Sequence, residues 1–289
     1  DADARPLGDI HTLDLLVLGD DDALQSRLTA VEEVLSTADT PEVDVAVTAQ
    51  AAAVSWRHNP QDYQSLVQRC LDAITAGDAY QLCLTNEVKV AGTFDPLEVY
   101  LRLREANPSH HGGLIVVDDI ALLSSSPEVF LSVDSDGHLT TKPIKGTRPR
   151  GATDEHDVKI ARELQSDAKE RAENLMIVDL MRNDIGKVSK VGSVEVPKLF
   201  EIESYATVHQ LVSTVTGELA EGESAWSAIL AAFPGGSMTG APKIRAMEII
   251  EELELGPRGT YSGCLGYLGA EGSAEFAMTI RSIIFQDGR

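Results

Sequence analysis

Two glutamates in the segment 167–174 have the spacing of a divalent-metal site. Glu170 and Glu173 lie three residues apart in a stretch with helical character, so both carboxylates project from one helix face, one turn apart. Mg²⁺ prefers oxygen ligands and keeps several waters, so this pair and a carboxylate of a bound molecule would make a sufficient site. The alternative is a solvated helix face, because Lys169 and Arg171 alternate with the acids.

A glycine-rich loop, residues 235–240, comes directly before a predicted helix at 242–253. Glycines and hydroxyl groups at a helix start leave backbone amides free to bind an anion. The loop is not a Walker A phosphate loop, because no Lys-Ser or Lys-Thr pair follows its last glycine. The alternative is an ordinary turn in which Thr239 caps the helix.

Lys145 and Glu128 each stand beside a predicted strand. Lys145 lies between an apolar residue and a glycine, with Arg148 close by, and burial next to a cation favours the neutral amine that a nucleophile requires. Glu128 is placed at a strand start, where a carboxylate can face a cleft as a general acid or base. Because most lysines and glutamates are surface charges, neither residue identifies a site alone.

Three further side chains have types suited to binding. Arg281 lies in a strand-like segment near the C-terminus, and an arginine can grip a carboxylate with two parallel hydrogen bonds. Tyr261 lies in the neighbouring strand region, whereas His209 stands alone in its segment. The alternatives are a surface salt bridge for Arg281 and a hydrogen-bonded structural role for His209.

The elements that must position these residues are helices mixed with hairpin-joined strands. The hydrophobic spacing predicts helices at 62–74, 96–106, 154–181 (with or without a break) and 242–253. It predicts strands at 80–90, 113–117, 120–124, 130–133, 139–142, 191–196, 211–216, 263–268 and 274–285. This order indicates an α+β fold with a large antiparallel sheet system.

The overall composition narrows the classes of partner. Forty-six acidic and 24 basic residues give a net charge of −22, which repels nucleic acid and anionic membrane surfaces. An anionic small molecule would therefore need a local site of cations, helix N-termini or a metal ion. No apolar run is long enough to span a membrane, and the first residues form no signal peptide, so we expect a soluble, cytoplasmic protein.

The three cysteines indicate a reducing compartment. Cys70, Cys83 and Cys264 are odd in number and widely spaced, which argues against a disulfide framework and a thiolate zinc site. Both ends of the sequence look trimmed, because it does not begin with Met and stops directly after a strand-like run.

Taken together, these segments resemble the chorismate-utilising family that includes anthranilate synthase, isochorismate synthase and aminodeoxychorismate synthase. The resemblance covers about residues 56–289, which would form the catalytic domain, and residues 1–55 would be the remnant of a variable N-terminal region. It rests on seven segments in order: GDAYQLCLT (77–85), SPEVF (126–130), PIKGTRPRG (143–151), ERAENLMIVDLMRNDIG (170–186), GGSMTGAPKIRAMEII (235–250), YSGCLGYLG (261–269) and TIRS (279–282).

The resemblance implies a fold of large antiparallel β-sheets packed together and flanked by helices. It also implies that Glu170 and Glu173 bind Mg²⁺, which holds chorismate. The residues that match substrate-binding positions of the family are Gln81, Thr147, His209, Gly236, Ser237, Gly240, Tyr261 and Arg281. The family's second pair of metal-site glutamates and a further glycine-rich loop would lie beyond Arg289, the last residue of this sequence.

Two positions favour the branch of the family that aminates chorismate. Aminodeoxychorismate synthases carry a nucleophilic lysine in the PIKGT segment, where anthranilate synthases typically carry alanine, and this chain has Lys145. Isochorismate-forming relatives place a lysine at the position of Gln81. The implied mechanism has Glu128 assist departure of the C4 hydroxyl group while Lys145 attacks C2, after which ammonia from a partner glutaminase subunit displaces Lys145. The alternatives are anthranilate synthase component I and a chorismate-binding subunit without catalysis.

Overall fold

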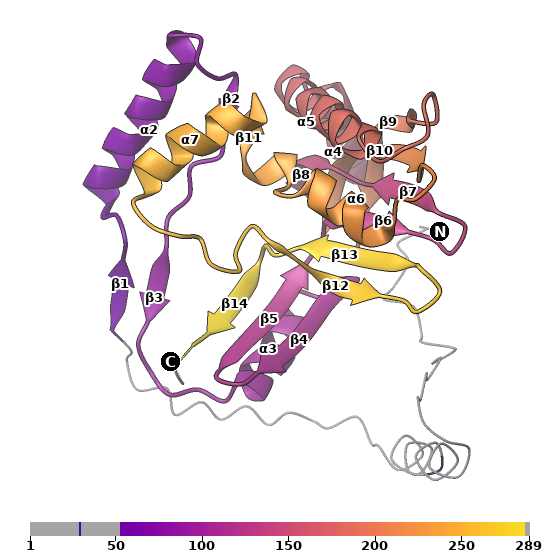
Figure 1. The fold of residues 1–289 in the computed structure, drawn as a ribbon. Coiled ribbons are helices and arrows are strands. Elements are labelled where there is room, and N and C mark those ends of the chain that lie inside the picture. Colours follow the sequence, from indigo (N-terminus) through magenta and orange to yellow (C-terminus); the bar gives the residue numbers. More distant parts are fainter. Residues whose placement is uncertain (1–28, 30–52, 287–289) are drawn as a thin grey trace. The chain divides into compact units, whose positions relative to one another are not determined.

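The computed structural model describes residue 29 and residues 53–286 (Figure 1). The prediction that residues 1–55 are the remnant of an N-terminal region falls almost wholly outside the described residues. None of the described helices is long and apolar enough to cross a membrane.

The largest described sheet has seven strands, and all of its pairs are antiparallel. Its order is β12-β13-β6-β7-β10-β8, with β9 on the other edge of β10. The strands are β6 Val129–Val133, β7 His138–Thr141, β8 Ile144–Pro149, β9 Glu195–Ser204, β10 Val208–Glu218, β12 Cys264–Leu268 and β13 Ala274–Met278. β7 and β8 pair with the same edge of β10, β7 with its C-terminal half and β8 with its N-terminal half. Lys145, on β8, therefore follows the β6–β7 hairpin within a few residues.

Three smaller sheets complete the described strands. One has the order β14-β5-β4, and the helix α3 Pro96–Ala106 packs against it. The other two are the pairs β1–β3 and β2–β11. Their strands are β1 Val54–Trp56, β2 Gln81–Leu82, β3 Val88–Val90, β4 His111–Val117, β5 Ile120–Ser126, β11 Gly240–Ala241 and β14 Ser282–Phe285.

The helix α5 Ala168–Gly186 supplies the apolar side chains that form the main core against the large sheet. Ile177 and Ile185 are fully buried there, together with Leu131 and Val215 from the sheet. Burying one such side chain contributes about 1.5–3 kcal/mol, so this face holds α5 firmly in register with the strands. The remaining helices are α2 Pro60–Thr75, α4 Asp154–Ser166, α6 Ala225–Ala232, α7 Lys243–Glu254 and the short 3₁₀ turn η1 Gly236–Met238.

Asp167 separates α4 from α5 and fixes where the second helix begins. Its backbone is extended, and its carboxylate accepts from the amides of Lys169 and Glu170 at 3.0 and 3.1 Å. An aspartate in this position satisfies amides that a helix start leaves without partners. The cap therefore fixes where α5 begins, and with it the positions of Glu170 and Glu173 in the first turns of the helix.

The α+β class with antiparallel sheets and flanking helices is confirmed. Predicted helices at 62–74, 96–106 and 242–253 correspond to α2, α3 and α7, and the long predicted helix is divided at Asp167. The helix α6 was not predicted. The alternative that Thr239 caps the helix after the glycine-rich loop is wrong, because α7 begins at Lys243, preceded by Pro242.

Three predicted strands are wrong in extent, each because tertiary contacts override the local pattern. The segment 80–90 forms only β2 and β3, since its middle is bonded to Glu254 and His58. The segment 191–196 is mostly a turn at Gly192, where φ is +85°, and β9 begins at Glu195. The segment 274–285 is divided between two sheets.

Candidate active site

Lys145 lies half-buried on β8, beside the glycine-rich loop. Its Nζ donates to the carbonyl oxygen of Ser237 at 3.5 Å. A bulge follows it directly, because Gly146 has φ +86° and the pairing of β8 with β10 shifts between Ile144 and Thr147. Arg148, beyond the bulge, meets Glu170 on α5. The lysine and Arg148 therefore have different partners, the glycine-rich loop and α5.

Glu128 immediately precedes β6 and is 7% exposed. Burial raises its pKa to about 7, against the opposing effects of Lys145, of a hydrogen bond with Ser237 and of Arg281. These effects require Glu128 to lie near all three groups, so the structure brings four sequence-predicted residues together. A carboxyl group with a pKa near neutrality can both give and take a proton at physiological pH.

The glycine-rich loop leaves no room for larger residues. A Cβ on Gly236 would lie 3.2 Å from the side chains of Leu180 and Met181 on α5. Gly240 has φ +151°, and a Cβ there would collide with the backbone oxygen of Gln81. Within the described residues, the amides of Gly236 and Ser237 donate to no acceptor. These two buried amides are suited to an anionic group.

Glu170 lies on the side of α5 that faces β8, and Glu173 follows it one helical turn later. The Glu170 carboxylate accepts from two nitrogens of Arg148 at 3.4 Å, and its Oε2 lies so near Gly146 that a Cβ there would be 3.0 Å away. Glu173 pairs with Lys169 at 3.2 Å. Two carboxylates on a rigid helix fit Mg²⁺ as part of a shell completed by water and ligand oxygens.

Another group could hold a cation by distance alone. Asp134, Asp136 and His138, all exposed in the β6–β7 turn, form the three-ligand cluster found among the described residues. Their contacts are those of the turn, since Asp134 accepts from the amides of Asp136 and His138 at 2.9 Å. The cluster therefore has a structural explanation.

His209 is 2% exposed on β10, and both ring nitrogens have partners within the chain. One lies 2.9 Å from Asp157 and the other 2.7 Å from the Ser204 hydroxyl group. Arg150 holds Asp157 with two bonds at 2.8 and 2.7 Å, and this pairing lowers the pKa of Asp157. The structure thus fixes the imidazole, and its contact with a substrate stays a prediction.

Arg281 and Gln81 offer groups without partners. The Arg281 guanidinium pairs with no carboxylate among the described residues, although it acts on Glu128 electrostatically. Arg281 itself has φ +49°, at the break between β13 and β14. The Gln81 Oε1 atom is buried without a donor, and strand alternation places its side chain on the side of Cys83, away from Leu82. A buried acceptor without a partner favours a bound donor group.

Tyr261 packs against the main core, and burial raises the pKa of its hydroxyl group. It lies in the turn that precedes β12, so the C-terminal strand region places it beside the same core as the loop.

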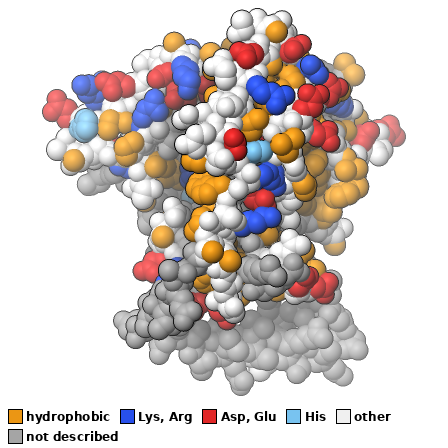
Figure 2. Space-filling view, turned by 90° about the vertical axis from the view of Figure 1, so that its left-hand side faces the viewer, with side chains coloured by type: hydrophobic (Ala, Val, Ile, Leu, Met, Phe, Trp, Pro, Cys, Tyr) orange, Lys and Arg blue, Asp and Glu red, His pale blue; other side chains and the backbone are white. Residues whose placement is uncertain are grey.

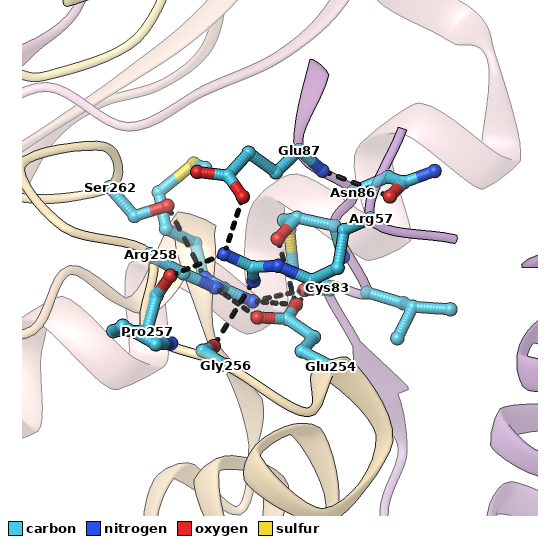
Figure 3. A network of polar contacts seen from close by, with 12 residues as sticks. Arg57, Cys83, Asn86, Glu87, Glu254, Gly256, Pro257, Arg258 and Ser262 are labelled. Atoms are coloured by element: carbon cyan, nitrogen blue, oxygen red, sulfur yellow. Dashed lines mark hydrogen bonds and ion pairs between the residues drawn. The ribbon is translucent and has the colours of Figure 1, made fainter. Parts of the chain in front are cut away.

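Sequence reasoning missed two buried ion pairs beneath the loop. Lys243 Nζ donates to Asp184 at 2.5 Å and to the carbonyl oxygen of Pro234 at 2.7 Å. Arg258 pairs with Glu254 at 2.7 Å (Figure 3). Each charged residue resembled an ordinary surface group in the sequence. The spacing of Glu254 and Arg258 gave no signal, because α7 ends at Glu254 and Arg258 lies in the turn that follows.

A lysine and a buried carboxyl group lie beside free loop amides and an unpaired arginine, which are groups suited to bind a small anionic molecule. The chain belongs to the chorismate binding enzyme family, whose sequence pattern matches residues 12–289. The resemblance to this family, inferred from the seven sequence segments, is confirmed.

Individual relatives agree with this assignment. The chain is 52% identical over 81% of its length to an aminodeoxychorismate synthase of Streptomyces pristinaespiralis, and it covers 32% of that protein. It is 46% identical over 79% of its length to an anthranilate synthase component 1 of Mycolicibacterium smegmatis, covering 44% of it. The crystal structure of anthranilate synthase component I from Streptococcus pneumoniae superposes with a TM-score of 0.81 at 36% identity, over 93% of this chain and 60% of that one. The chain thus spans less than half the length of these two sequence relatives.

Proposed function

We propose that this protein aminates chorismate at C4 to give 4-amino-4-deoxychorismate, through a covalent adduct with Lys145. The observation that carries the proposal is the position of Lys145 beside Glu128 and the Ser237 loop. Similarity to aminodeoxychorismate synthases supports it. The product would serve p-aminobenzoate and folate biosynthesis.

The first half of the reaction needs a proton donor and an amine in reach of one ring. Lys145 forms a bond to C2, both ring double bonds shift, and the C4–O bond breaks. Glu128, whose pKa of about 7 leaves much of it protonated at neutral pH, gives its proton to the departing hydroxyl group, which leaves as water. The proton that the Lys145 amine loses can pass to the Glu128 carboxylate, which restores the acid.

Ammonia completes the reaction. It forms a bond to C4 and the double bonds shift back, while the bond between C2 and the Lys145 nitrogen breaks. The lysine nitrogen takes the proton of the restored Glu128 acid as it leaves, and the new amine gives a proton back to the Glu128 carboxylate. Arg281 and the amides of Gly236 and Ser237 would hold substrate carboxylates during both steps. Glu170 and Glu173 would hold Mg²⁺, which neutralises and orients a substrate carboxylate when bound.

The three cysteines of this sequence are not suited to release ammonia from glutamine. Burial raises the pKa of the thiols of Cys70 and Cys83, and that of Cys264 to about 11. A nucleophilic cysteine needs the thiolate form, so none of the three is suited to hydrolyse an amide. A partner glutaminase, in a cytoplasmic heterodimer, would supply ammonia.

The test is incubation of the protein with chorismate, Mg²⁺ and ammonium, next to the variant Lys145→Ala, with products identified by mass spectrometry. We expect aminodeoxychorismate from the wild type and a sharp loss in the variant. Anthranilate as the product would instead assign the chain to the anthranilate synthases, which also occur among its relatives. Chorismate binding without turnover would overturn the proposal in favour of a non-catalytic binding subunit.

A further inference from the structure

Arg258 joins four segments of the chain through a single guanidinium group (Figure 3). Its Nη1 donates to the Met238 carbonyl oxygen at 2.6 Å and to the Ser262 hydroxyl group at 3.3 Å. Its Nη2 donates to the Cys83 carbonyl oxygen at 2.7 Å. Nε and Nη2 bind the two carboxylate oxygens of Glu254 at 2.9 and 2.7 Å. All five N–H donors that a guanidinium offers can thus be used, which lysine cannot reproduce.

Three of the bonded residues adjoin candidate site residues. Met238 follows Ser237 in the glycine-rich loop, and Ser262 follows Tyr261. Cys83 lies two positions after Gln81, directly beyond β2. Residues 81, 237 and 261 are far apart in the sequence, so their side chains can meet only if these segments are held together. The Arg258 guanidinium is the group that touches all three segments.

The charge of Arg258 is balanced at the same place. Glu254 is buried at the end of α7, and its Oε1 also accepts from the backbone amide and the hydroxyl group of Thr85, both at 2.8 Å. A buried charge is tolerated only when it is paired and hydrogen-bonded. Here every oxygen and nitrogen of the pair has partners, so the network specifies one arrangement of the segments.

A second arginine closes the outer side of the same turn. Arg57, after β1, donates to the carbonyl oxygens of Gly256 and Pro257 at 3.1 and 2.7 Å, and pairs with Glu87 at 3.0 Å. These bonds fix the two residues that precede Arg258. The guanidinium is therefore presented to the loop from a rigid turn.

We propose that Arg258 is a positioning residue of the candidate active site, which aligns the Ser237 loop, the Gln81 strand and the Tyr261 turn. It touches carbonyl and hydroxyl oxygens of the framework and acts on the reaction through Ser237, Gln81 and Tyr261. The inference rests on the proposed function, because activity on chorismate is its principal readout.

The test compares Arg258→Lys with Arg245→Gln. Arg245 lies on α7 and forms an exposed ion pair with Glu248 at 2.9 Å, so its loss is a matched control for removing an arginine–glutamate pair. The thermal unfolding midpoint, KM for chorismate and kcat with ammonium are measured for both. We expect Arg258→Lys to remain folded and to lower kcat/KM by on the order of tenfold to a hundredfold, since small misplacements of reacting groups cost this much. We expect Arg245→Gln to stay within about twofold of wild type.

A double-mutant cycle separates positioning from general weakening. If Arg258 acts through the loop, Ser237→Ala should reduce kcat/KM much less in the Arg258→Lys background than in wild type. Glu173→Gln, on α5, should reduce it equally in both. The proposal would be overturned if folded Arg258→Lys kept the wild-type kcat and KM. It would also be overturned if Ser237→Ala reduced kcat/KM by the same factor in both backgrounds.

Two further measurements distinguish failure of this inference from misfolding of a variant and from failure of the proposed function. If Arg258→Lys does not fold, Glu254→Gln, which keeps the side-chain volume and one acceptor oxygen, replaces it in the same cycle. If the wild type does not aminate chorismate, the proposed function fails. In that case the dissociation constant for chorismate in the presence of Mg²⁺ is measured by calorimetry for the same double-mutant cycle. An unchanged dissociation constant in Arg258→Lys would overturn the positioning role.

Discussion

Arg148 holds the carboxylate of Glu170 through two nitrogens, each 3.4 Å from Oε1, and also pairs with Asp167 at 3.4 Å. The candidate metal ligand is therefore already neutralised by a cation on β8. A divalent ion that binds Glu170 must compete with this guanidinium or share the carboxylate with it.

Removal of Arg148 should strengthen Mg²⁺ binding. In Arg148→Gln the Glu170 carboxylate has no ion pair to lose, so we expect a severalfold lower dissociation constant for Mg²⁺ by calorimetry. Glu170→Gln should weaken binding by about tenfold or more. Unchanged affinity in Glu170→Gln would remove this glutamate from the metal site.

Loss of the Asp167 cap should weaken both α5 and its metal face. Asp167→Ala removes the acceptor for two amides and should lower the free energy of unfolding by about 1 kcal/mol. Thr153→Ala removes the corresponding cap of α4 and is the matched control. Denaturant unfolding and Mg²⁺ titration should show a comparable loss of stability in both variants but a change in metal affinity only in Asp167→Ala.

Glu128 should make the fold less stable at neutral pH than at pH 4. Its pKa lies near 7 in the folded chain against 4.5 in a free side chain, so the folded state keeps a proton that the unfolded state has lost. Stability therefore falls as pH rises from about 4.5 to 7 and levels off above, by roughly 3 kcal/mol in total.

The variant Glu128→Gln removes this titration. It should be more stable than wild type at pH 8 and close to it at pH 4, by urea unfolding at each pH. An equal difference at both pH values would show that Glu128 keeps an ordinary pKa. The same variant should lose most of its turnover, because the amide cannot give a proton to the leaving hydroxyl group.

Gly240→Ala should separate β11 from β2. The left-handed backbone and the collision with the Gln81 carbonyl group should together cost about 1–3 kcal/mol or more. Gly186→Ala, at the end of α5 with open space around it, is the control and should be neutral or slightly stabilising. A Gly240→Ala protein with wild-type unfolding and chorismate binding would contradict the close packing of this loop.

The sequence predicted what depends on neighbours in the chain. The helix α3 has its predicted bounds because Asp95 caps it and Pro96 begins it, both local signals. The break at Arg281 could not be read from alternating residues, since it is the pairing of β13 with β6 and of β14 with β5 that divides the strand.

In the candidate site, too, local features could be predicted and contacts between distant segments could not. Lys145, Glu128 and Glu170 were predicted as site residues from motifs, and the structure gives each a definite surrounding. The buried partners of the loop were not, because Asp184 and Lys243 lie 59 positions apart and nothing local marks them as a pair.

Figure 2 shows one face on which Lys and Arg side chains are interspersed with Asp and Glu. This face carries no single basic patch, in agreement with the net charge of −22.

The buried thiol of Cys70 gives the protein a built-in reporter of its own opening. Cys70 lies in the cluster between α2 and α7, whereas Cys83 and Cys264 are partly exposed. A thiol reagent can reach Cys70 fully only after α2 separates from α7. The rate at which Cys70 is labelled under native conditions therefore measures the local stability of this helix pair.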